Sequence, residues 1–77
     1  MARIERFEQR PIGGVSLHKP VTCGYNWHDV DGRRVLFLET YGSRDRKFPD
    51  KVSQSIQLDE DAARELQQLI DRAFPRI

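Results

Sequence analysis

Hydrophobic and polar residues alternate and then change period between Lys51 and Pro75, and this stretch predicts one strand that runs directly into one helix. Val52, Ile56 and Leu58 share one parity while serines and a glutamine take the other, which is the period of two expected for a half-buried strand. Beyond residue 58 the apolar residues recur at steps of three and four and form the single stripe of an amphipathic helix: Ala62, Ala63, Leu66, Leu69, Ile70, Ala73 and Phe74.

Charged residues and a proline mark the two ends of this helix. Asp59 stands at the N-cap position, and Glu60 follows in the first turn, where the helix dipole favours acidic side chains. Arg72 lies in the last turn, and Pro75 ends the helix because it has no backbone N–H to donate. We therefore expect a helix over residues 59–74.

A second strong pattern surrounds the dipeptide Asp31-Gly32, which is flanked on both sides by residues that favour strands. Such a dipeptide is typical of a two-residue β-hairpin turn. With these two residues as the loop, the predicted cross-strand pairs are Trp27 with Leu36, Tyr25 with Leu38 and Cys23 with Thr40. One face of the hairpin is then apolar and is expected to pack on the helix stripe: Val21, Cys23, Tyr25, Trp27, Leu36 and Leu38.

The other face of the same hairpin mixes polar and aromatic residues: Thr22, Asn26, His28, Val35, Phe37, Glu39 and Tyr41. One helix covers only one side of a small sheet, so Phe37 and Tyr41 require a different explanation. The N-terminal segment covers them, a dimer buries them, or they remain open as a binding surface, since exposed apolar patches on small proteins usually mark interaction sites.

A basic segment, GSRDRKFPDK, joins the second hairpin strand to the strand before the helix. The segment has about ten residues, which is longer than a hairpin requires, and long loops often carry function. It contains one aromatic residue, Phe48, and four basic ones: Arg44, Arg46, Lys47 and Lys51. The segment is suited to contacting phosphates and stacking on a base; alternatively, Phe48 only fixes the loop to the core.

These elements predict one α+β domain that spans residues 1–77, with an antiparallel sheet of three or four strands and one C-terminal amphipathic helix packed on one face. The sheet is expected within residues 20–58. Residues 1–14 are compatible with an edge strand or an arm that ends at the break formed by Pro11 and the glycines after it.

Composition and charge limit the classes of function. The net charge of +1 argues against a strongly electrostatic nucleic-acid binder, but residues 1–58 carry +3 and residues 59–77 carry −2, so the sheet is the basic side. The single cysteine, Cys23, excludes an internal disulfide, and no apolar run is long enough to span a membrane. We therefore expect a cytoplasmic protein with no membrane partner.

No set of residues predicts catalysis, a metal site or a cofactor. On the hairpin register Cys23 and His28 point to opposite faces, which disfavours a nucleophile–base pair and a shared metal ion. Gly13-Gly14 stands alone and is too little for a phosphate-binding loop. We expect a protein that is not an enzyme and that has no cofactor.

The run Ser55-Ile56-Gln57-Leu58-Asp59, followed by a helix over Glu60–Phe74, resembles the positive-cofactor-four family of transcriptional coactivators and their bacterial and phage relatives. Members of that family are homodimers that bind single-stranded DNA, and the resemblance covers about residues 20–74. It implies a DNA-binding sheet face on which Phe37 and Tyr41 stack on bases. The residues that it places along the phosphate backbone are Arg33, Arg34, Arg44, Arg46, Lys47 and Lys51.

Three hypotheses of function remain at this stage. The first is a small nucleic-acid-binding module that prefers single-stranded DNA, acts as a homodimer and serves transcription regulation. The second is a protein-interaction module, or a small phage-type inhibitor that binds a host protein through Val35, Phe37 and Tyr41. The third is a duplex reader whose three-stranded sheet enters the major groove, as at the N-termini of tyrosine recombinases.

Overall fold

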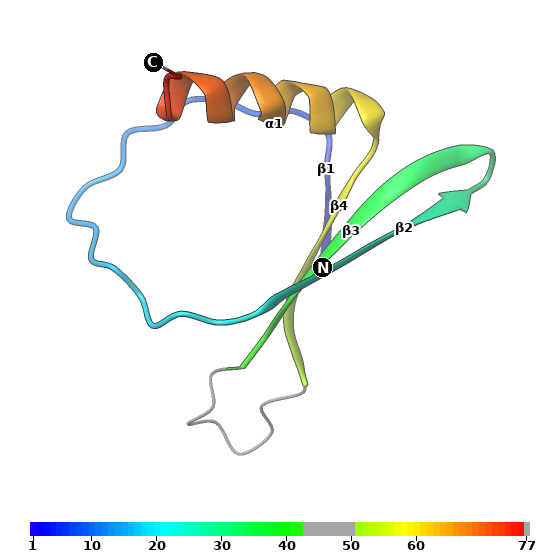
Figure 1. The fold of residues 1–77 in the computed structure, drawn as a ribbon, viewed down its shortest axis with the longest axis horizontal. Helices are drawn as coiled ribbons and strands as arrows, with labels where there is room; N and C mark the ends of the chain where they lie inside the picture. Colours follow the sequence, from blue (N-terminus) through cyan, green and yellow to red (C-terminus); the bar gives the residue numbers. More distant parts are fainter. Residues whose placement is uncertain (43–50, 77) are drawn as a thin grey trace.

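A computed structural model describes residues 1–42 and 51–76 of the chain, which fold into a four-stranded sheet and one helix (Figure 1). The elements follow the order β1 (Ala2–Ile4), β2 (Cys23–Val30), β3 (Arg33–Tyr41), β4 (Val52–Leu58) and α1 (Glu60–Ala73). The strand order in the sheet is β1-β4-β3-β2. The predicted α+β class with a C-terminal helix is therefore confirmed.

The turn between β2 and β3 has the geometry that its sequence requires. Asp31 and Gly32 both have positive φ, 52° and 77° respectively, as expected for the two central residues of a type I′ hairpin turn. This turn fixes the register, and the three predicted pairs are confirmed: Trp27 with Leu36, Tyr25 with Leu38 and Cys23 with Thr40.

The two strands that flank this hairpin in the sheet differ in direction. β4 runs antiparallel to β3, with a register shift between Thr40 and Tyr41 that places Val52 opposite Tyr41. This shift corrects the prediction that Val52 shares a face with Ile56 and Leu58, because one extra residue in a strand reverses the alternation. The short edge strand β1 pairs in parallel with β4, so the sheet is mixed.

The pleat divides the sheet into two faces, which are called the helix-side face and the second face. The helix-side face consists of Ala2, Ile4, Cys23, Tyr25, Trp27, Asp29, Arg34, Leu36, Leu38, Thr40, Ile56 and Leu58. The second face consists of Arg3, Gly24, Asn26, His28, Val30, Arg33, Val35, Phe37, Glu39, Tyr41, Val52, Ser55 and Gln57.

The helix begins where the sequence predicts. The Asp59 side chain accepts a hydrogen bond from the backbone N–H of Ala62 at 3.0 Å, which satisfies one of the free donors of the first turn. Leu58 and Ala62 are 2% and 1% exposed, so the core includes the place where the end of β4 meets the first turn of α1. The helix contacts β3 and β4.

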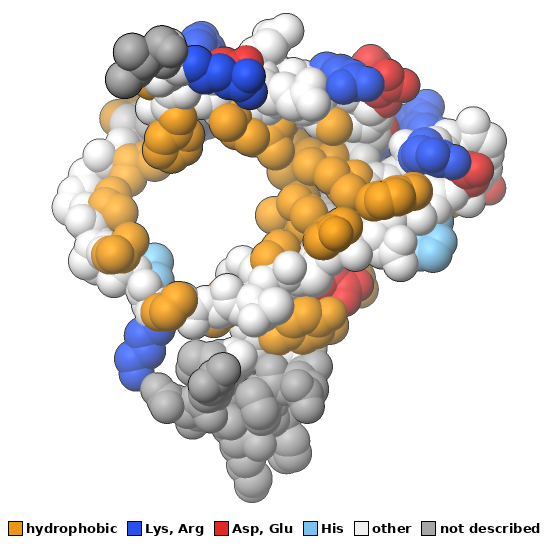
Figure 2. All heavy atoms as spheres, in the orientation of Figure 1, with side chains coloured by type: hydrophobic (Ala, Val, Ile, Leu, Met, Phe, Trp, Pro, Cys, Tyr) orange, Lys and Arg blue, Asp and Glu red, His pale blue; other side chains and the backbone are white. Residues whose placement is uncertain are grey.

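The helix does not cover β2. Tyr25 and Trp27 on the helix-side face are 72% and 52% exposed, and Ile70 and Phe74 in the second half of α1 are 48% and 75% exposed. The prediction that the whole apolar hairpin face packs on the helix stripe is therefore wrong for its outer strand. The right-handed twist of the sheet offers the physical reason, because it rotates β2 away from a helix that lies over β3 and β4. Figure 2 shows hydrophobic side chains along the margin of an opening between these elements.

Candidate nucleic-acid interface

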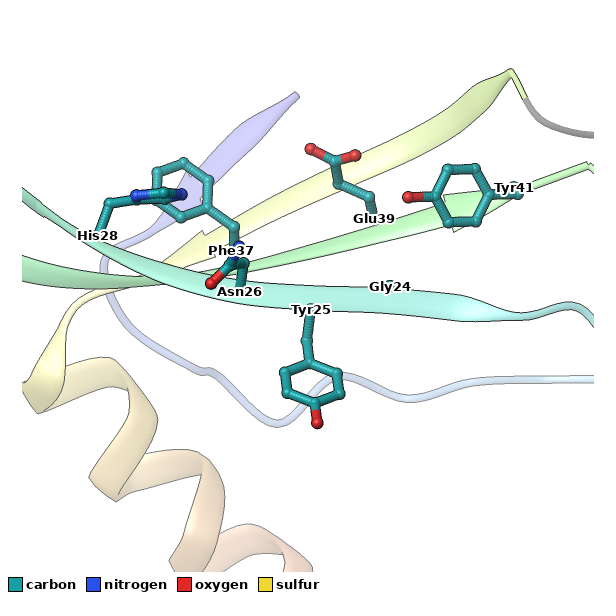
Figure 3. Close-up of a pocket in the computed structure, with 7 residues that line it drawn as sticks. All are labelled: Gly24, Tyr25, Asn26, His28, Phe37, Glu39 and Tyr41. Atoms are coloured by element: carbon teal, nitrogen blue, oxygen red, sulfur yellow. The ribbon is translucent and has the colours of Figure 1, made fainter.

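The second face carries a shallow hollow beside its aromatic residues (Figure 3). An open pocket of about 470 Å³ lies over β2 and β3, and its lining residues are Gly24, Tyr25, Asn26, His28, Phe37, Glu39 and Tyr41. Tyr25 points to the other side of the sheet, toward the helix. The remaining side chains are therefore two aromatic rings, an imidazole, an amide and a carboxylate.

Phe37 and His28 form one end of this pocket. Their ring centroids lie 5.6 Å apart with an interplanar angle of 73°, an edge-to-face arrangement that fixes the orientation of both rings. Phe37 is half-buried and His28 is exposed, so this ring pair still presents a surface to solvent. The Asn26 side chain accepts a hydrogen bond from the backbone N–H of Trp27 at 2.8 Å, which holds its amide beside Phe37.

Tyr41 forms the other end and lies across Gly24 of the neighbouring strand. A Cβ atom on Gly24 would approach the Tyr41 hydroxyl oxygen to 2.9 Å and the ring carbon Cε2 to 3.1 Å. Glycine inside a strand often marks such a close approach. The backbone N–H of Tyr41 also donates to the carbonyl of Thr22 at 3.3 Å, which holds the end of β3 against β2.

Glu39 lies between the two aromatic residues on the same strand and the same face. Its side chain is half-buried, and among the residues that the structure describes it has neither an ion-pair nor a hydrogen-bond partner. A carboxylate in this state offers two acceptor oxygens to a ligand that carries N–H donors. The sequence placed Glu39 on this face but gave no signal for its lack of a partner.

The basic residues are distributed differently from the prediction. Arg33 lies on the second face, and its Nη1 is 3.5 Å from Oδ2 of Asp59. Arg34 lies on the helix side, and its Nε donates to Oδ1 of Asp29 at 3.1 Å. The structure therefore does not bring Arg33 and Arg34 together on one surface, because neighbouring residues of a strand point to opposite faces.

Arg3 on β1 joins the second face, which sequence reasoning missed. A second shallow hollow of about 320 Å³ is lined by Arg3, Arg33, Val35 and Gln57, together with Val30 and Asp31 of the hairpin tip. The second face thus runs from Tyr41 to an end that carries two arginines. A strand of three residues whose partner lies more than fifty positions away leaves no periodic signal in the sequence.

The other predicted site residues fall into three groups. Lys51 is exposed and directly precedes β4. The predicted contacts of Arg44, Arg46, Lys47 and Phe48 lie outside the described residues. Val35 is only 6% exposed and belongs to the core. The prediction that Val35 forms an open apolar patch with Phe37 and Tyr41 is therefore wrong for Val35.

Within residues 1–42 and 51–76, no group of three or more histidine, cysteine or acidic side chains is arranged to hold a metal ion. In the same part of the chain, no helix combines the length and apolarity that crossing a membrane requires.

The chain was compared with known proteins at the level of families, curated sequences and solved structures. No family model matches it, and neither a curated protein nor a solved structure does. The functional argument therefore rests mainly on the geometry of the second face.

Proposed function

We propose that this protein binds single-stranded nucleic acid, with DNA as the favoured form, through the second face. The observation that supports the proposal most is the arrangement of Phe37, Glu39 and Tyr41 at alternate positions of β3 along an open pocket, with the Tyr41 ring lying across Gly24 of the neighbouring strand. Four residues along the strand place the Cα atoms of Phe37 and Tyr41 about 13 Å apart. Accessible aromatic rings act as stacking platforms for unpaired bases.

The polar groups of the face fit bases better than phosphates at its centre. Glu39 would repel a phosphate but accepts N–H donors, such as the exocyclic amino group of cytosine. Phosphate contacts then fall to the basic residues at the edges of the face, Arg3, Arg33 and Lys51, with the basic segment after β3 as a further candidate. A single strand of DNA satisfies both the base contacts and the phosphate contacts if its bases lie over Phe37 and Tyr41 and its backbone lies toward these edges.

Single strands are favoured over a duplex because the aromatic rings are recessed. Both Phe37 and Tyr41 are half-buried within the sheet surface, where a flat unpaired base can reach them. A base inside a duplex has both of its faces covered by neighbours.

The burial of Val35 also bears on the protein-interaction alternative. Without Val35, the centre of the second face holds two half-buried aromatic rings among polar groups, and its other exposed apolar side chains, Val30 and Val52, lie at its two ends. This composition is less suited to the apolar centre of a protein interface than to stacking with hydrogen-bond acceptors beside it. The resemblance to single-stranded-DNA-binding coactivators agrees with the same proposal.

The test is fluorescence anisotropy with labelled single-stranded and duplex oligonucleotides at several salt concentrations. We expect tighter binding to single strands, with an affinity that falls as salt rises. The double variant Phe37→Ala/Tyr41→Ala should lose about 5- to 150-fold in affinity for each ring that stacks, which corresponds to about 1–3 kcal/mol per base.

A matched control exchanges the two rings. The variant Phe37→Tyr/Tyr41→Phe keeps both aromatic faces and the composition of the chain, so it should bind within about threefold of the wild type. Normal binding by the alanine double variant would refute stacking on this face. An absence of binding by the wild type at low salt would refute the proposed function itself.

A further inference from the structure

The pocket on the second face contains two polar side chains that have hydrogen-bonding groups left for a ligand. Glu39 is half-buried, and within residues 1–42 and 51–76 its carboxylate has no partner. Asn26 is exposed and lines the same pocket from the neighbouring strand. A half-buried carboxylate has lost part of its hydration, so a ligand that donates hydrogen bonds to it restores what burial removed.

The amide of Asn26 is oriented so that its nitrogen remains available. Its Oδ1 accepts a hydrogen bond from the backbone N–H of Trp27 at 2.8 Å. A backbone N–H donates only to the oxygen of an amide, so this contact also decides which end of the side chain is Nδ2. The Nδ2 group carries two donors, and in the described part of the chain neither has a partner. Asn26 therefore adds donors to the acceptor oxygens of Glu39.

The strand register places these two groups within reach of one base. Asn26 pairs with Phe37 and Gly24 pairs with Glu39, so Asn26 and Glu39 are diagonal neighbours across β2 and β3. Diagonal neighbours lie about 7–8 Å apart, which long side chains can span. In Figure 3 Asn26 lies beside Phe37, and Glu39 follows further along β3. A base stacked on the Phe37 ring therefore has its edge near both the amide and the carboxylate.

We infer that this pocket recognises guanine in a single strand, an inference that rests on the proposed function. The Watson–Crick edge of guanine carries one acceptor, O6, followed by two adjacent donors, N1–H and N2–H. Nδ2 of Asn26 donates to O6, and the two oxygens of Glu39 accept from N1–H and N2–H as a parallel, charge-assisted pair. An unpaired guanine exposes this edge, whereas a duplex uses it for base pairing.

The other three bases lack this order of acceptor and donors. Adenine and cytosine each have a ring nitrogen acceptor beside their amino group, so one oxygen of Glu39 would face a lone pair. Thymine has a single donor, N3–H, between two carbonyl oxygens, and one of these carbonyls would face Glu39. Only guanine gives a partner to each group that Asn26 and Glu39 present.

The charges at the edges of the second face favour a nucleotide over a basic peptide. An arginine guanidinium also presents two parallel N–H donors, so the carboxylate of Glu39 by itself would accept either ligand. However, Arg3 and Arg33 lie on the same face, and Lys51 directly precedes β4. These cations repel a basic peptide and attract the phosphates of a strand whose base occupies the pocket.

The test is fluorescence anisotropy with a labelled oligothymidine of about twelve nucleotides, in which one central thymine is replaced by another base. Guanine at this position should raise affinity about 5- to 150-fold over thymine, which is the discrimination expected of one bidentate contact. Inosine keeps O6 and N1–H but lacks the N2 amino group, so it should retain only part of the gain. Adenine and cytosine should give no gain. These measurements use the wild-type chain and therefore do not depend on the folding of a variant.

Two variants test the two groups separately. Glu39→Gln leaves one acceptor in place of two, and Asn26→Asp keeps an oxygen for the Trp27 N–H but replaces the Nδ2 donors with an acceptor. Each should lower the ratio of guanine to thymine affinity at least fivefold. The ratio removes the effect of the altered charge, because both oligonucleotides carry the same number of phosphates. The matched control, Asp61→Asn, removes a negative charge from the exposed surface of α1 and should keep the guanine preference.

The possible failures of this inference and of the proposed function are distinguishable. Equal affinity of the wild type for the guanine and thymine oligonucleotides would overturn guanine recognition and leave single-strand binding in place. A guanine preference that survives Glu39→Gln would place the guanine outside this pocket and overturn the inference as well. An absence of binding to every oligonucleotide at low salt would overturn both.

Discussion

The close contact between Gly24 and Tyr41 gives the sharpest test of the second face. In the variant Gly24→Ala, the new Cβ would lie 2.9 Å from the Tyr41 hydroxyl oxygen and 3.1 Å from Cε2, both shorter than ordinary van der Waals contact. The ring must therefore move by about 0.5–1 Å to restore normal separations. Because the obstructing atoms are the far end of a rotatable side chain, we expect the ring to swing aside rather than the strands to separate.

The effect on stability should be small. Glycine in a strand is less stable than alanine by about 0.5–1 kcal/mol, and this gain offsets part of the cost of moving the ring. We expect the free energy of unfolding, measured by urea denaturation, to change by less than about 1 kcal/mol. Gly13 has no atom within 4 Å of the position where a Cβ would be built, so Gly13→Ala serves as the control.

The effect on binding should be larger. If Tyr41 stacks on a base, its displacement removes up to ~1–3 kcal/mol, a loss of about 5- to 150-fold in affinity for single-stranded DNA. A double-mutant cycle with Tyr41→Ala separates the causes, because Gly24→Ala should have almost no further effect once the ring is absent. Wild-type affinity in Gly24→Ala would refute the reasoning. An equal loss with and without Tyr41 would refute it as well.

Three further predictions concern single side chains. Leu58→Ala should lower the free energy of unfolding by about 2–5 kcal/mol, since the side chain is 2% exposed; a loss below about 1 kcal/mol in urea denaturation would contradict its place in the core. Asp59→Ala should cost about 1 kcal/mol by removing the hydrogen bond to the Ala62 N–H, whereas Asp59→Asn retains an acceptor and should cost less; equal thermal stability of the two variants would argue against capping. Glu39→Gln removes a charge without changing shape and should raise affinity for oligothymidine about twofold, as expected for one carboxylate about 8 Å from a phosphate in water; unchanged affinity in the anisotropy assay would place Glu39 away from the bound strand.

Much of the secondary structure could be predicted because its causes lie within a few residues of sequence. The helix follows from a local period of apolar residues and from the capping aspartate Asp59. The hairpin register follows from Asp31-Gly32, since the turn needs two residues that tolerate positive φ and it leaves only one way to pair the strands. The same alternation placed Phe37 and Tyr41 on the face away from the helix.

Most of the features that the sequence did not predict, or predicted wrongly, depend on how the strands are assembled. The parallel pairing of β1 with β4, the recruitment of Arg3 to the second face and the burial of Val35 depend on how the assembled strands lie. The bulge near Tyr41 reversed the facing of Val52 in a way that alternation alone cannot show. Residue type did not reveal the contact between Gly24 and Tyr41 either, because that contact exists only after β2 and β3 pair.

The amino-acid sequence by itself therefore determined the elements, the hairpin register and the separation of an apolar face from a polar and aromatic one. Only the tertiary structure decided how far the helix reaches across the apolar face, and it left Tyr25 and Trp27 uncovered. The physical reason is that alternation specifies which side chains avoid water, whereas strand twist and helix position decide which of them find a partner within the same chain.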